Sequence, residues 1–487
     1  LGQVRVQSEV ADLDVAEYQA QLRMNTGDTY SPLLIDTNIA RLEGVVARQG
    51  LSFVQVEPRI TRNPETQTLD IDLVLVRGER VFVERIDIEG NTTTIDQVVR
   101  RQFRTAEGDG FSPRDVRQAA ERIRALGFFA QAAVNAQPGS APDKVVVNVD
   151  LVEAPTGAIS FGLTYGTNNG AGIALGFNEI NFLGRGQSLR FDLSSARDTN
   201  DFTFNFAEPA FLGRDVRFKL AANYRSTEKA SASYDTATAS LSPALEFALS
   251  PQSRFEVRYR FARDEVVNNG STSSVIIAED ARGSENLSSL GYTYSFDTRT
   301  NGLNPNAGFL LRFGQDFAGV GGDVNYVSST VLALAETKVM NEAVSLRAIA
   351  EGGMLETFGG YESRVTDRFF GAGKIRGFER NGIGPREGGD ALGGNMFAAL
   401  RFEADFPIGL PEEYGISGGA FYDIGSVWGL DNEGTAQGVD AARRSAAGLS
   451  VFWDTPIGPL RMNFSRPIDK EAYDISRNFE LTISTKF

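Results

Sequence analysis

The sequence predicts α+β modules followed by a transmembrane antiparallel β-barrel of about 16 strands. Two observations lead to this prediction. Residues 1–154 mix strand patterns with helical patterns, whereas from residue 155 apolar and polar residues alternate with a period of two. In addition, the 487-residue chain has no apolar run of about 18 residues, which excludes a helical membrane protein.

The composition excludes most catalytic chemistry. The chain has no histidine and no cysteine, so Ser-His-Asp triads, thiolate metal sites and disulfides cannot form. Lys and Arg total 48 against 63 Asp and Glu, and the net charge of −15 argues against nucleic acid, because phosphate binding needs a basic face. We therefore predict no enzyme activity, no cofactor, no metal site and no nucleic-acid partner.

The module next to the barrel is expected at residues 80–154. A strand pattern over 81–88 is followed by two helical patterns, the second of which ends at Gly127. Two strand patterns, at 129–135 and 145–152, complete the module. Its predicted order is therefore strand, helix, helix, strand, strand.

The same order appears once before, in residues 1–79. Gly-Asp-Thr-Tyr-Ser-Pro at 27–32 matches Gly-Asp-Gly-Phe-Ser-Pro at 108–113, and a helical pattern ends near Gly50. The alternative is a coincidence of short motifs, but the matched order over two units favours an internal repeat. The last two strands of this first module are expected at 52–60 and 69–76.

Residues 155–487 are predicted to form the barrel. In the segment 254–261, for example, Arg and Glu alternate with Phe, Val and Tyr. A soluble β-sandwich would also alternate, but here the polar face carries charges over more than 300 residues with no helical pattern between the strands. A barrel with lipid outside and water inside predicts this pattern, and it also explains the mean hydropathy of −0.20.

One long segment, 358–395, interrupts the alternation. It is too long and too rich in glycine for a hairpin turn, so it is either a functional loop or a disordered one. Its centre holds the cluster Lys374, Ile375, Arg376, Gly377 and Phe378.

This cluster resembles the Val-Arg-Gly-Phe loop motif of the outer-membrane assembly-factor superfamily, with Ile375 in place of Val. The two modules resemble tandem POTRA domains, and nearly the whole chain is similar to the BamA family of that superfamily. Three other signatures of the superfamily have counterparts at 421–428, at 456–460 with Arg466 and Pro467, and at 297–299 with Pro305 and Gly308.

The resemblance implies a function. The protein would fold and insert β-barrel proteins into the outer membrane of a Gram-negative bacterium, with its POTRA modules in the periplasm. Implied partners are unfolded outer-membrane protein clients, accessory outer-membrane lipoproteins, periplasmic chaperones and the lipid bilayer. The family usually has five POTRA modules, so three are expected to be missing upstream of Leu1.

Two rival families share parts of this pattern. A TamA-type translocation and assembly factor has the barrel and the loop motif, usually with three POTRA modules. A two-partner-secretion transporter has two modules and exports a polypeptide, but it usually starts with a plug helix that is not seen here. A plain porin would have no POTRA repeat.

Strand alternation also predicts partners for the loop. It places Glu403 and Asp423 on the lumen face of their strands. The resemblance implies that the loop folds into the barrel and that Arg376 meets these two carboxylates, which suit the fork of an arginine. The alternatives are a solvated arginine and two ordinary lumenal charges.

The first and last barrel strands must pair to close the barrel. The resemblance implies that this seam is weak and opens sideways as a lateral gate, and glycines in the first strand would weaken it further. An open seam would offer an unpaired strand edge to an incoming client strand. The residues predicted at this lateral seam are Gly157, Phe161, Gly162, Leu163, Phe479, Leu481, Ile483 and the terminal Phe487.

Overall fold

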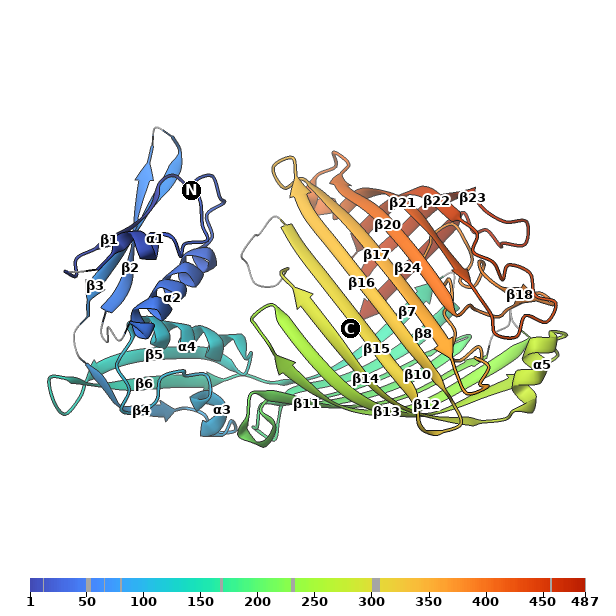
Figure 1. Cartoon of the computed structure of the whole chain (residues 1–487), viewed down its shortest axis with the longest axis horizontal. Coiled ribbons are helices and arrows are strands. Elements are labelled where there is room, and N and C mark those ends of the chain that lie inside the picture. Colours follow the sequence, from blue (N-terminus) through green and yellow to red (C-terminus); the bar gives the residue numbers. More distant parts are fainter. Residues whose placement is uncertain are drawn as a thin grey trace. The chain divides into compact units, whose positions relative to one another are not determined.

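The computed structural model describes residues 1–11, 13–49, 54–64, 66–78, 81–166, 170–228, 233–299, 307–455 and 458–486. These residues form two compact units, one built mainly from residues 1–156 and the other mainly from residues 157–487 (Figure 1). Among the described residues, no helix is long and apolar enough to cross a membrane.

The first α+β module contains a three-stranded sheet in the order β1-β3-β2, with β1 parallel and β2 antiparallel to β3. Ile39 and Leu42 of its long helix are buried against Ile71 and Leu73 of the central strand. The predicted helix end at Gly50 and the predicted strand start at Ser52 lie outside the described residues. The elements are β1 (Val4–Ser8), α1 (Val15–Gln19), α2 (Pro32–Arg48), β2 (Val54–Asn63) and β3 (Thr68–Arg77).

The second module repeats this topology, with the sheet order β4-β6-β5. Its second helix begins where Ser112 accepts a hydrogen bond from the backbone of Asp115, and Gly127 follows it with a positive φ of 73°. The predicted order of elements and the internal repeat are therefore confirmed. The elements are β4 (Phe82–Glu89), α3 (Asp96–Arg100), α4 (Pro113–Ala125), β5 (Phe129–Pro138) and β6 (Lys144–Glu153).

The second unit is a closed antiparallel barrel, and the described residues supply sixteen strands to it. Each strand pairs with the next one along the chain, and β24 pairs with β7 to close the circle. The strands are β7 (Gly157–Gly166), β8 (Gly170–Phe182), β9 (Gln187–Ala196), β10 (Thr199–Glu208), β11 (Val216–Glu228), β12 (Tyr234–Ala248), β13 (Ser253–Asn268), β14 (Glu285–Asp297), β15 (Ala307–Gly322), β16 (Tyr326–Val339), β17 (Val344–Thr357), β20 (Met396–Pro407), β21 (Ile416–Trp428), β22 (Arg444–Thr455), β23 (Gly458–Asp469) and β24 (Phe479–Lys486).

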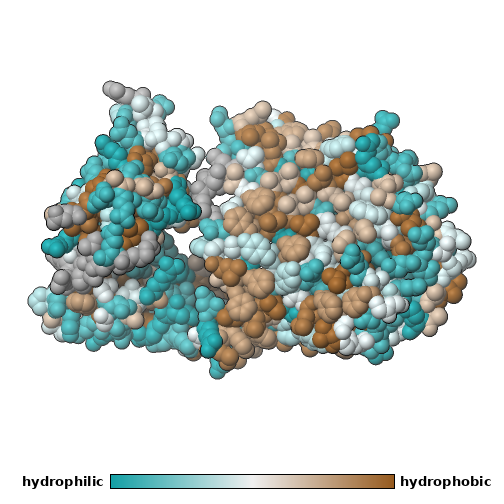
Figure 2. All heavy atoms as spheres, viewed as in Figure 1, coloured by the Kyte–Doolittle hydropathy of each residue, from teal (hydrophilic) through white to brown (hydrophobic). Residues whose placement is uncertain are grey.

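The two faces of the barrel wall differ as the alternation predicts. On β13, Val257 and Tyr259 are 41% and 37% exposed on the outer face, whereas Arg258 between them forms an ion pair with Asp316 of β15. Figure 2 shows hydrophobic side chains gathered over the face of the barrel strands that it presents. The outer surface is thus apolar without being packed against protein, as a lipid-facing wall would be.

One expectation for the barrel half is wrong, because it contains a helix. Helix α5 (Ser274–Ala281) follows β13, and its Val275 and Ile276 are buried against Tyr234 and Leu392. Eight residues are too short to show a helical period next to strands, so α5 left no clear pattern in the sequence. The remaining short elements are η1 (Phe211–Gly213), η2 (Glu412–Tyr414) and the hairpin of β18 (Arg386–Glu387) and β19 (Asp390–Ala391).

Candidate functional site: a long loop held on the lumenal wall

The loop between β17 and β20 packs part of its length into a small apolar cluster inside the barrel. Ile375 and Phe378 from the loop are buried together with Phe397 of β20, Val427 of β21 and Ala446 of β22. Burial of these two side chains holds the middle of the loop against three neighbouring strands.

Arg376 lies between these two anchors and binds Asp423 in a bidentate manner. Its Nε donates to Oδ2 of Asp423 at 2.7 Å, and its Nη2 donates to Oδ1 at 2.6 Å. The backbone N–H of Arg376 donates to the same Oδ2 at 2.9 Å. Because the side chain of Asp423 is fully buried, these three hydrogen bonds replace the water that its charge would otherwise need.

Glu403 is the second carboxylate at this arginine. Its Oε1 lies 2.8 Å from Nη1 of Arg376, and its Oε2 accepts a hydrogen bond from Nη1 of Arg347 at 2.9 Å. Arg461 of β23 approaches within 3.8 Å. Glu403 therefore joins the loop to β17 and β23 as well as to its own strand.

Phe421 completes the site; it begins the signature at 421–428, but no contact with Arg376 was predicted for it. The guanidinium carbon of Arg376 lies 3.7 Å from the centre of the Phe421 ring, a cation–π contact. Phe421 precedes Asp423 by two residues and so shares its lumenal face. A large aromatic residue on an otherwise polar face was the signal that could have identified it.

Lys374 fixes the start of the motif. Its Nζ donates to Oε2 of Glu351 on β17 at 2.7 Å and lies 4.1 Å from the centre of the Phe397 ring. Arg401 also pairs with Glu351 and donates to the carbonyl of Gly373 at 2.8 Å. Glu351 and Arg401 are thus two further wall residues that bind the loop.

Gly377 is required by its backbone and by its surroundings. Its φ is +90°, a conformation that favours glycine, and a Cβ at this position would lie 2.9 Å from the Cβ of Ala446. Its carbonyl accepts a hydrogen bond from the backbone N–H of Arg477 at 2.9 Å.

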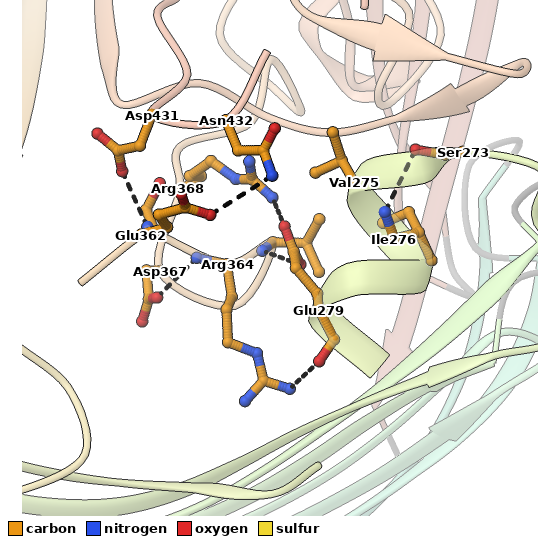
Figure 3. Close-up of polar contacts among 12 residues, drawn as sticks. Ser273, Val275, Ile276, Glu279, Glu362, Arg364, Asp367, Arg368, Asp431 and Asn432 are labelled. Atoms are coloured by element: carbon orange, nitrogen blue, oxygen red, sulfur yellow. Dashed lines mark hydrogen bonds and ion pairs between the residues drawn. The ribbon is translucent and has the colours of Figure 1, made fainter. Parts of the chain in front are cut away.

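A second set of polar contacts holds the base of the loop, residues 361–368, against α5 (Figure 3). Glu279 of α5 pairs with Arg368 and accepts a hydrogen bond from the backbone N–H of Val365 at 2.9 Å. Arg364 donates to the carbonyl of Gly283 at 2.9 Å. Both arginine side chains are almost fully buried, so these contacts are the polar partners that make their burial tolerable.

The loop base is also braced from within and from the β21–β22 connection. Asp367 accepts hydrogen bonds from the Tyr361 hydroxyl at 2.6 Å and from the backbone of Arg364 at 2.9 Å. Asp431 accepts one from the backbone of Ser363 at 2.8 Å. No contact of this brace was predicted, because α5 itself was not predicted.

The seam is the shorter of the two pairings that β7 makes. Among the described residues, which end at 486, five register pairs join it to β24, from Gly162–Lys486 to Gly166–Thr482, whereas ten join it to β8. Of the predicted seam residues, Gly162, Leu163 and Ile483 lie within the five pairs. Gly157 and Phe161 pair with β8, Phe479 and Leu481 pair with β23, and Phe487 lies outside the described residues.

The signature segments occupy different parts of the wall. Residues 421–428 form most of β21, and Arg466 and Pro467 lie in β23. Gly308 lies in β15, and Asp297 ends β14. Pro305, Pro456 and Ile457 lie outside the described residues, as does the predicted boundary between residues 79 and 80.

Known proteins resemble all or most of this chain. It is 27% identical to the outer membrane protein assembly factor BamA of Neorickettsia risticii, with 100% of this chain and 66% of that protein covered. It is 25% identical to the human sorting and assembly machinery component 50 homolog, with 71% and 73% covered. The crystal structure of Haemophilus ducreyi BamA lacking POTRA domains 1–3 matches with a TM-score of 0.71 at 22% identity, covering 100% of both chains.

The chain spans just under two thirds of the length of the Neorickettsia relative, and the Haemophilus structure establishes the fold alone. The relatives carry the names of assembly factors rather than of enzymes, and with the barrel they indicate the outer membrane.

Two family models divide the chain much as the structure does. The POTRA model, described as a surface antigen variable number repeat, matches residues 81–154. The Omp85 superfamily domain matches residues 181–487, which is more than half of the chain. The protein therefore belongs to the Omp85 superfamily.

Proposed function

We propose that the protein folds and inserts β-barrel proteins into the outer membrane, with the seam between β7 and β24 as its lateral gate. The observation that carries the proposal is the seam, where the described residues form five register pairs between β7 and β24 against ten between β7 and β8. A shorter pairing takes less free energy to separate, and the freed edges could pair with a client strand.

The α+β modules would receive clients in the periplasm. Their sheets end in the edge strands β2 and β5, and an edge strand can pair with an extended segment of another chain. The proposed partners are unfolded outer-membrane proteins, accessory outer-membrane lipoproteins of an assembly complex, periplasmic chaperones and the lipid bilayer. The name of the relatives, outer membrane protein assembly factor, supports this assignment.

The loop motif would hold the lumen side of the machine in place. Arg376 joins the loop to Asp423 and Glu403, so its proposed role is positioning. No bond of the client is made or broken in this proposal, because folding of the client in lipid supplies the driving force. An enzyme and a cofactor are therefore not part of it.

The test is a disulfide across the seam. Thr164 and Ser484 are register partners, and the chain contains no other cysteine, so Thr164→Cys with Ser484→Cys creates a single lock. We expect the oxidised protein in liposomes to lose most of its client insertion, and reduction to restore it.

The control places the same lock inside the β7–β8 hairpin. Ala158 and Asn178 are register partners there, so Ala158→Cys with Asn178→Cys leaves the seam free and should not affect insertion. If the oxidised seam variant inserted clients at the wild-type rate, the lateral-gate proposal would be wrong.

A further inference from the structure

The segment between β23 and β24, residues 470–478, contains a buried ion pair that the site described above does not use. Arg444, at the start of β22, donates from Nε to Oδ2 of Asp474 at 3.0 Å and from Nη2 to Oδ1 at 3.3 Å. Both side chains are 0% exposed. A bidentate pair so completely removed from water fixes the position of the segment that carries it.

Other polar groups complete this pair. The guanidinium also donates to the Tyr473 hydroxyl at 3.1 Å, to the carbonyl of Ala442 at 3.0 Å and to Ser426 Oγ at 3.3 Å. The carboxylate of Asp474 accepts the backbone N–H of Glu471 at 2.8 Å. The pair is therefore well satisfied, and loss of either member would leave the other charge buried without a partner.

The same segment runs alongside the long loop as a short antiparallel ladder. Phe378 and Ser476 form a β-bridge. The backbone of Arg477 donates to Gly377, that of Glu379 donates to Ile475, and that of Ile475 donates to Gly382, each at 2.9 Å. Arg477 and Glu379 also pair through their side chains at 3.3 Å.

These contacts connect two parts of the molecule through very few residues. Arg376, bound to Asp423, is the neighbour of Gly377, whose carbonyl binds Arg477. Arg477 in turn lies two residues before Phe479, where β24 begins. A displacement of the motif must therefore break the ladder or move the start of the last barrel strand.

We propose that Arg444 and Asp474 are positioning residues that couple the loop motif to the seam strand β24. The buried pair holds residues 474–477 in line with the loop, so the loop and the start of β24 keep their places together. The proposal concerns the loop and seam of the proposed function, but it is a statement about coupling and can be tested without measuring insertion.

Hydrogen exchange on the full chain tests the coupling, with peptides from residues 374–383 and 470–480 as reporters. In Asp474→Asn we expect both peptides to exchange about tenfold faster or more, because the ladder between them depends on the pair. In Arg376→Gln we expect the same two peptides to respond, which shows that the coupling acts in both directions. Peptides from β12 and β13 must stay protected, which shows that the barrel is folded.

The chain offers a matched control one residue away. Arg443 pairs with Asp469 at 3.1 Å, but its side chain is 69% exposed and Asp469 is the last residue of β23. Arg443→Gln should leave both reporter peptides unchanged. If Asp474→Asn fails to fold, Arg444→Lys replaces it, because it keeps the charge and removes the fork.

The outcomes separate coupling from a local structural role. Faster exchange in residues 470–480 alone, with 374–383 at the wild-type rate, would overturn the proposal. The seam disulfide reports on the gate independently, so the coupling can fail while the proposed function stands, and the reverse also holds.

Discussion

The single guanidinium of Arg376 forms ion pairs with two carboxylates, those of Asp423 and Glu403. A buried ion pair is a poor indicator of stability by itself, but removing one member leaves a buried charge unpaired. The arginine therefore matters most for the position of the loop, because its Nε, Nη1 and Nη2 contact carboxylates on two strands.

We predict that Arg376→Ala destabilises the loop and impairs barrel assembly or client insertion. Leaving the carboxylate of Asp423 buried without its fork should cost about 3–5 kcal/mol. Client insertion into liposomes and proteolysis of the loop measure the effect. Arg312→Ala, which changes an exposed arginine of β15, is the control, and wild-type insertion by Arg376→Ala with an intact loop would contradict the prediction.

Alanine substitutions at Gly377 and Gly373 distinguish the cost of backbone strain from that of a steric clash. Both have a positive φ, but a Cβ at Gly373 would meet nothing within 4 Å, whereas at Gly377 it would meet Ala446. We expect Gly373→Ala to cost about 1 kcal/mol of stability from strain alone, and Gly377→Ala clearly more.

The clash can be relieved by a second change. Adding Ala446→Gly to Gly377→Ala should recover part of the lost stability, measured by chemical unfolding as a double-mutant cycle. Equal losses in the two single glycine variants, with no recovery in the double variant, would show that packing against Ala446 is irrelevant.

At the scale of elements, the end of β6 holds the turn before α3. Glu153 accepts backbone hydrogen bonds from Thr94 at 2.6 Å and from Thr93 at 3.0 Å, and a side-chain bond from Thr92 at 2.8 Å. Burial alone would raise the pKa of Glu153, but these hydrogen bonds outweigh it and lower the pKa to about 2.

The hydrogen bonds to Glu153 make the stability of this module depend on pH. Because the pKa is lower in the folded state, this stabilisation is complete above the ordinary pKa of 4.5 and is lost as the pH falls toward about 2. We expect the urea midpoint of this module to fall between pH 6 and pH 3, and to fall less in Glu153→Gln. Glu84 and Glu107, whose pKa values are lowered by backbone hydrogen bonds from Ser140 and Ile86, supply a further part of the fall.

A fluorophore attached to a single cysteine can report the unfolding of this module within the full chain. The protein has no cysteine, so Gln137→Cys on β5, an exposed position, gives one labelling site. An identical loss of stability in the wild type and in Glu153→Gln would contradict the assignment.

The elements differ in how far the sequence predicted them. Barrel strands have a period of two that repeats for many residues, and both α+β modules repeat one order, so these were predictable. Helix α5 is eight residues long, and it packs against Tyr234 and Leu392, which are distant in the chain. The contacts of Phe421 and Glu351 with the loop were missed because their partners, Arg376 and Lys374, are distant in the chain.

In the molecule as a whole, the barrel wall has an outer face toward lipid and an inner face toward the water of the lumen. Val331 of β16 is exposed on the outer face beside Phe313, and its neighbour Thr330 is exposed on the lumen face beside Gly314. The two positions share one strand and one depth, so they isolate the effect of the face.

We predict opposite responses to the same substitution at these two sites. Val331→Arg should destabilise the protein in lipid by about 2–4 kcal/mol, since a charge on the lipid face loses its hydration. Thr330→Arg should be close to neutral. Unfolding by urea from liposomes compares them, and equal effects would mean that the outer face does not contact lipid.

The closure of the barrel by β7 and β24 has a consequence for how the chain itself folds. Every other barrel pairing joins strands that follow one another among the described residues, and so forms from a short hairpin or a single loop. Closure alone brings together residues from opposite ends of the domain, Gly162 with Lys486 for example, and the entropy of such a long loop must be overcome first. We therefore expect this closure to be the last step of folding. The strand pairing that we propose to open during client insertion would then also be the last one to form when the protein folds.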